Sequence, residues 1–121
     1  MLINFTNHPS AKWTAEQLTT ASVYGEIRDI PFPEVEPDGH EIYISELADK
    51  YVAQIMAFSP NAVLCQGEMT LAFAVAARLA KSNVTTLAAC SKREVSENIG
   101  ANGKTVKHAE FRFVRFRKYF I

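Results

Sequence analysis

The sequence predicts an α/β domain whose sheet is mostly parallel and which ends in a β-hairpin. Short apolar runs alternate with helical periodicities over residues 1–90, and the later runs lack the polar alternation of half-exposed strands. An Asn-Gly pair at 102–103 separates two strand-like segments, which is the strongest short-range pattern for a hairpin turn. With 121 residues, 48% of them hydrophobic, the chain can form the core of a single domain spanning 1–121.

The first half of the chain predicts two short strands and a short helix between them. Residues 1–6 are apolar and β-branched and predict the first strand. Thr14 and Gln17 have the spacing of a capping box, so a short helix should follow. Residues 26–32 predict a second strand, which Pro33 closes because proline cannot donate to a strand ladder.

The middle of the chain contains the clearest helix. Asp38 and Glu41 again have capping spacing, and apolar residues recur every three or four positions as far as Phe58. The unbroken apolar run at 62–65 is typical of a central strand buried on both faces. The alanine-rich segment 71–80 predicts a closely packed helix.

The last third predicts a fourth strand at 84–90, followed by hairpin arms at 92–99 and 104–116. Parallel strands joined by helices usually adopt the order 2-1-3-4. The chain reverses direction between strands one and three of that order, so their C-terminal loops splay apart and leave a crevice, where ligands bind in open α/β sheets. We therefore expect a functional site at this crevice.

Charge and composition exclude several classes of partner. Lys plus Arg and Asp plus Glu both total 13, and the zero net charge argues against binding to duplex nucleic acid. No run approaches the length of a membrane span, and the N-terminus lacks a secretory signal pattern. Cys65 and Cys90 lie too far apart to form a CxxC motif and are expected to be reduced, buried thiols. These features predict a cytoplasmic protein.

Polar residues gather in the loops after the first and third strands. Gly67 would allow a ligand close to the backbone, and the start of the helix near Glu68 would favour a phosphate. A tight strand-to-helix turn explains the same residues without a ligand. The candidate ligand-binding residues in these loops are Asn7, His8, Ser10, Gln66, Gly67, Glu68 and Thr70.

Ser91, Lys92 and Arg93 follow the fourth strand and would form a third, basic loop at the same edge of the sheet. Arginine can grip phosphate oxygens in pairs, and lysine can stabilise charge that develops on an attacked phosphorus. A solvated charged turn is the alternative interpretation. His40 and His108 have no acidic or thiol neighbours at metal-site spacing, so we expect no metal and no cofactor.

Three segments together are similar to the small CRISPR-associated Rossmann-like (CARF) proteins, including the compact ring nucleases that bind and cut cyclic oligoadenylate second messengers. NFTNHPS resembles the polar loop that opens those proteins. CQGEMT, which leads into an alanine-rich helix, resembles their strand-to-helix phosphate loop, and ACSKREV resembles their basic terminal loop.

The resemblance implies a Rossmann-like homodimer that holds a cyclic oligoadenylate across its two-fold axis. It also implies metal-independent cleavage, in which a ribose 2′-hydroxyl attacks the neighbouring phosphorus. Lys92, Arg93 and His8 would then be the catalytic residues. The polar residues of the three loops, including Ser91, would bind the ligand.

Two alternatives remain open from the residues alone. A sensor that binds the nucleotide without cutting it would need nearly the same side chains. The chain could instead be an interaction subunit, because the segment FRFVRFRKY alternates aromatic residues with arginines and could pair with a partner.

Overall fold

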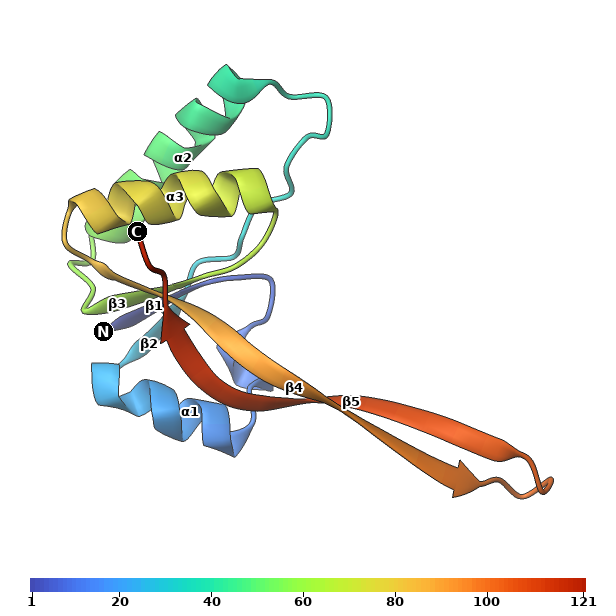
Figure 1. The fold of residues 1–121 in the computed structure, drawn as a ribbon. Helices are drawn as coiled ribbons and strands as arrows, with labels where there is room; N and C mark the ends of the chain where they lie inside the picture. Colours follow the sequence, from blue (N-terminus) through green and yellow to red (C-terminus); the bar gives the residue numbers. More distant parts are fainter.

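A computed structural model describes residues 1–121 and contains a five-stranded mixed sheet with helices on both faces (Figure 1). The predicted α/β class is therefore confirmed. The strands are β1 (Leu2–Phe5), β2 (Ile27–Asp29), β3 (Ala62–Cys65), β4 (Thr85–Ile99) and β5 (Thr105–Lys118). Their order is β2-β1-β3-β4-β5, which differs from the expected 2-1-3-4 because β5 extends the sheet beyond β4. The sheet is parallel only in part, since the long β4–β5 pair is antiparallel.

The helices form two layers around the sheet. α2 (Glu41–Met56) and α3 (Met69–Lys81) cover one face, and α1 (Ala15–Ala21) covers the other (Figure 1). Short 3-10 turns at Ser10–Lys12 and Ser22–Tyr24 flank α1. Each face has its own hydrophobic cluster, as expected for strands that are buried on both sides.

Helix boundaries follow the capping residues, with one correction. Thr14 caps α1 by accepting a hydrogen bond from the Gln17 N–H at 3.2 Å, as the sequence predicts. The predicted cap of α2 at Asp38 is wrong. His40 takes this position, and its Nδ1 lies 3.4 Å from the Tyr43 N–H. An imidazole nitrogen can accept this bond as a carboxylate does, so the helix begins two residues later.

The largest departure from the sequence prediction lies in the C-terminal third. β4 does not end at Cys90 but continues to Ile99, so Ser91, Lys92 and Arg93 belong to a strand rather than to a basic loop. Beyond the bulge at Cys90/Ser91, residues 91–112 form a two-stranded ribbon that projects from the domain (Figure 1). We call residues 91–112 the arm. Apart from half-buried Gly100, all of its residues are exposed.

Both cysteines are free thiols, but only Cys65 is fully buried, whereas Cys90 is half-buried. Burial raises the pKa of Cys65 to about 12, so this thiol stays protonated and unreactive at neutral pH. No helix has the length and apolar character that crossing a bilayer requires.

Candidate functional site

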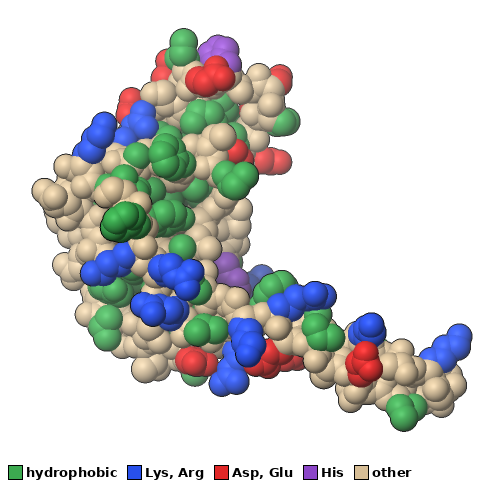
Figure 2. All heavy atoms as spheres, in the orientation of Figure 1, with side chains coloured by type: hydrophobic (Ala, Val, Ile, Leu, Met, Phe, Trp, Pro, Cys, Tyr) green, Lys and Arg blue, Asp and Glu red, His purple; other side chains and the backbone are tan.

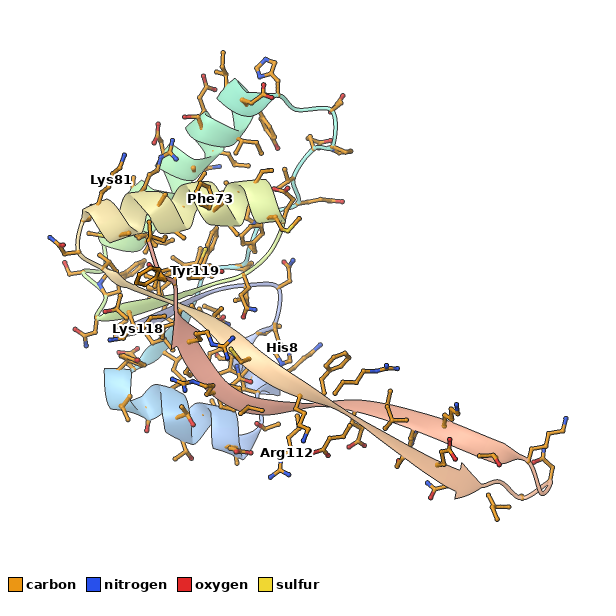
Figure 3. All side chains as sticks on the ribbon, viewed as in Figure 1. His8, Phe73, Lys81, Arg112, Lys118 and Tyr119 are labelled. Atoms are coloured by element: carbon orange, nitrogen blue, oxygen red, sulfur yellow. The ribbon has the colours of Figure 1, made fainter.

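A cleft of about 490 Å³ opens at the carboxyl ends of β1 and β3, where the sequence predicts a crevice. Its walls come from the loop after β1, the start of α1, the loop after β3, and the base of the arm. The lining residues are Thr6, Asn7, His8, Lys12, Trp13, Thr14, Gln17, Leu64, Gln66, Gly67, Ala89, Ser91, Phe111 and Phe113. In Figure 2 the molecule is hollowed between the body and the arm, and a histidine side chain is visible there. Figure 3 labels this residue as His8.

The loop after β1 is held in place by the buried side chain of Asn4. Its Nδ2 donates to the His8 carbonyl and to Asp29 Oδ1, both at 2.9 Å, and its Oδ1 accepts from Thr6 Oγ1 at 2.8 Å. Trp13 Nε1 donates to the same His8 carbonyl at 3.1 Å. With its backbone fixed in this way, the loop presents the exposed side chains of Asn7 and His8 at the cleft without further ordering.

Gln66 and Gly67 line the cleft, but both also have structural roles. The Gln66 side chain replaces a strand partner, because its Oε1 accepts from the Ala89 N–H at 2.9 Å and its Nε2 donates to the Ala89 carbonyl at 3.4 Å. A Cβ on Gly67 would lie 2.5 Å from the buried ring of Phe32. Glycine is therefore required at position 67 for packing, whether or not a ligand binds.

Glu68 and Thr70 lie outside the cleft, and they already occupy the start of α3. The Glu68 carboxylate accepts the backbone N–H groups of Thr70 and Leu71 at 3.0 and 2.9 Å. The hydroxyl of Thr70 also donates to it, and these bonds lower the pKa of Glu68. A phosphate could reach this helix end only by displacing the carboxylate.

Replacing Glu68 with alanine should destabilise the protein by about 0.5–1 kcal/mol at neutral pH, because α3 loses its N-terminal cap. The folded-state pKa is lowered, so the contribution of Glu68 is fully present above the unfolded value of 4.5. It is lost as the pH falls through the lower folded value. Urea unfolding of both proteins should therefore show a difference at pH 7 that shrinks below pH 4.5. Replacing the exposed Glu46 of α2 is the control and should change little at either pH.

The remaining candidates are divided between the cleft and the arm. Ser91 lines the cleft, whereas Ser10 lies beside Asp29 and donates its hydroxyl to that carboxylate at 3.1 Å. Lys92 and Arg93 are exposed on the arm, outside the cleft. Because β4 continues through these two residues, the strand carries them away from the sheet edge.

Nine of the 14 lining residues were not among the sequence candidates, and four of them give the cleft a cation and aromatic side chains. Lys12 brings a cation, and Trp13, Phe111 and Phe113 form aromatic walls. Trp13 and Phe113 are buried, but the ring of Phe111 is 74% exposed. The one sequence pattern that pointed toward Phe111 and Phe113 was the alternation of aromatic residues and arginines near the C-terminus. This pattern does not show that β5 folds back to the cleft.

This arrangement can bind a ligand that has both a flat ring and an anionic group. The exposed face of Phe111 can stack on an aromatic base. Lys12, His8 and Asn7 line the same cleft and supply a cation, an imidazole and an amide. The His8 Nε2 lies 3.4 Å from the Lys12 carbonyl, so the imidazole is held near the lysine backbone while its ring remains exposed.

Comparison with known proteins gives a family without a described activity. The family model described as "Uncharacterized protein MJ1673 family" matches residues 1–117, so the chain belongs to this family. No curated protein and no solved structure matches the chain.

Proposed function

We propose that this member of the MJ1673 family binds a cyclic oligoadenylate or a related nucleotide in the cleft between β1, β3 and the arm. One observation carries the proposal: the exposed ring of Phe111 and the fixed loop bearing His8 line the same cleft, with Lys12 beside them. An adenine base would stack on Phe111, and a phosphate would lie near Lys12 and His8.

The resemblance of the loops after β1 and β3 to CARF proteins favours a cyclic oligoadenylate over other nucleotides, whereas the third segment, ACSKREV, lies in β4 and adds no support. A cleft of about 490 Å³ suits a single nucleotide unit, so a ring of several nucleotides would have to span the clefts of two copies. The position at the carboxyl ends of β1 and β3 is the usual ligand position of Rossmann-like sheets. The two free thiols favour the cytoplasm as the place of action.

Cleavage of the ring is a second candidate function, which His8 favours because its imidazole lies at the cleft. In that reaction a ribose 2′-hydroxyl would lose its proton to His8 and attack the adjacent phosphorus. A 2′,3′-cyclic phosphate would form, and the 5′-oxygen would leave as a hydroxyl after protonation. Of the three predicted catalytic residues only His8 lines the cleft, because Lys92 and Arg93 lie on the arm, and Lys12 is the lysine that the cleft offers to a phosphate.

Binding and cleavage can be separated with one ligand series. The purified protein is mixed with cyclic tetra-adenylate or cyclic hexa-adenylate without added metal, and binding is followed by thermal shift and calorimetry. A nucleotide that raises the unfolding temperature and is recovered intact identifies a sensor. Linear products ending in 2′,3′-cyclic phosphates identify a ring nuclease, and the absence of any binding contradicts the proposal.

Replacing Phe111 with alanine should weaken nucleotide binding about 5-fold to 150-fold, because stacking on one base contributes roughly 1–3 kcal/mol. Replacing Lys12 with alanine should also weaken binding, and the loss should shrink as salt is added. Phe73 and Lys81 on α3 provide matched controls, since both lie outside the cleft (Figure 3). Equal losses in the controls would show that the nucleotide binds elsewhere.

A further inference from the structure

The two faces of the arm differ in chemistry. Side chains alternate across a strand, so one face of the ribbon continues outward from the cleft residue Phe113. It carries Phe113, Phe111, Ala109, Lys107 and Thr105 on β5, and Ser91, Arg93, Val95, Glu97 and Ile99 on β4. Five of these ten residues are apolar, and we call this the apolar face. Ile99 continues the same face toward the tip. Phe111, Val95 and Ile99 are 74%, 55% and 82% exposed.

The opposite face is polar. Its cross-strand pairs are Lys92 with Arg112, Glu94 with Glu110, Ser96 with His108, and Asn98 with Val106, and Val106 is its one apolar side chain. An isolated two-stranded ribbon is at best marginally stable in water, and nothing in the chain covers this one. A partner that covered the apolar face would therefore stabilise the ribbon.

Charges on the apolar face match those of a second copy of the chain. Consider two arms that pack face to face, run in opposite directions and place the two Val95 side chains opposite each other. A residue a given number of positions before Val95 then lies opposite the partner residue that number of positions after it. Arg93 then faces Glu97 of the partner subunit, and the symmetry repeats this ion pair. Within its own chain Glu97 also lies 3.8 Å from Lys107, so each glutamate would lie between two cations. On β5, Lys107 faces the ring of Phe111 of the partner subunit, which allows a cation–π contact.

Opposed arms also fit the shape of the molecule better than arms with the same direction. The apolar face continues into the cleft, so the body rises on the same side of the arm, and Figure 2 shows the resulting angle between body and arm. Two arms that faced each other with the same direction would bring their bodies into collision.

The dimensions of the arm extend the contact to the cleft. Its nine residue pairs, Ser91–Phe113 to Ile99–Thr105, span about 30 Å. A ribbon about 10 Å wide would cover about 300 Å² on each copy, whereas stable interfaces cover about 800 Å² on each side. The arms alone therefore supply less than half of such an interface, and the rest would have to come from the tips, where Ile99 of one copy lies opposite Ser91 of the other.

We infer that two copies of this chain associate through the apolar faces of their arms, with the turn at 100–104 of each arm lying over the cleft of the other copy. Lys104 in this turn adds a second lysine to a cleft whose own lining has Lys12 alone. The interface does not require a bound nucleotide. A role for Lys104 in holding the nucleotide rests on the proposed function.

Charge reversal tests the arm contact directly. R93E has glutamates at positions 93 and 97, and E97R has arginines at both positions. In a dimer of either variant alone, like charges would therefore face each other at both contacts. A mixed pair places glutamate opposite arginine at both contacts. By sedimentation without nucleotide we expect the wild type at twice 13.5 kDa, and dimer dissociation constants at least about tenfold higher for each variant alone. An equal mixture of the two variants should recover the dimer.

Arg112→Glu is the matched control, because Arg112 is an exposed arginine on the opposite face of the arm (Figure 3). It should leave the dimer unchanged. Any of three results would overturn the inference. These are a monomeric wild type, single variants that dimerise like the wild type, and a dimer that is lost through Phe73→Glu on α3 instead.

Hydrogen exchange tests the position of the tip. Amides of residues 7–13 at the cleft should exchange more slowly in the wild-type dimer than in monomeric R93E. Equal exchange would overturn the placement of the tip over the cleft. Neither measurement uses a nucleotide, so failure of cyclic oligoadenylate binding would contradict the proposed function and leave the arm interface standing.

Discussion

Replacing Asn4 with alanine should destabilise the protein by about 2–3 kcal/mol, because the variant leaves several buried polar groups without partners. Asn4 is 1% exposed, and its side chain makes hydrogen bonds to Thr6, His8 and Asp29. The loss should appear as a lower urea midpoint with an unchanged slope. Amide exchange in residues 7–13 should also become faster, since the loop at the cleft loses its anchor.

The matched control is Asn7→Ala, which removes the same side chain from an exposed position three residues away. This variant should change stability by less than about 0.5 kcal/mol. If nucleotide binding is confirmed, Asn4→Ala should weaken it through loosening of the loop, and Asn7→Ala through loss of a contact. Equal stabilities for the two variants would show that the Asn4 network contributes little to the fold.

Replacing Gly67 with alanine should destabilise the protein by about 1–3 kcal/mol, the usual cost of forcing an extra carbon into a filled core. The new Cβ would lie 2.5 Å from the ring of Phe32. That ring is 4% exposed and lies 4.8 Å, centroid to centroid, from the ring of Phe5, so it has little room to move away.

A double-mutant cycle with Phe32→Leu tests whether the contact with Phe32 causes the loss of stability in Gly67→Ala. The smaller side chain removes the ring, so Gly67→Ala should cost less than half as much in this background. Thermal and urea unfolding of the four proteins measure the coupling. If the cost is the same in both backgrounds, the glycine is needed for the backbone of the turn and not for the approach of Phe32.

The sequence determined the layered elements and the place of the cleft. The buried strand at 62–65 and the helix that follows it could be predicted because a strand with two covered faces needs an unbroken apolar run. The alternation of strands and helices also placed the loops after β1 and β3 at one sheet edge, and Asn7, His8, Gln66 and Gly67 do line one cleft.

Only the tertiary structure decided which side chains that cleft contains. The local sequence at Cys90 and Ser91 is compatible with the end of a strand. β4 continues into the arm because it pairs with β5. This distant pairing carries Lys92 and Arg93 out along the arm and brings Phe111 and Phe113 to the cleft. Strand pairing between residues far apart in sequence leaves no local pattern, so the polar wall could be predicted and the aromatic wall could not.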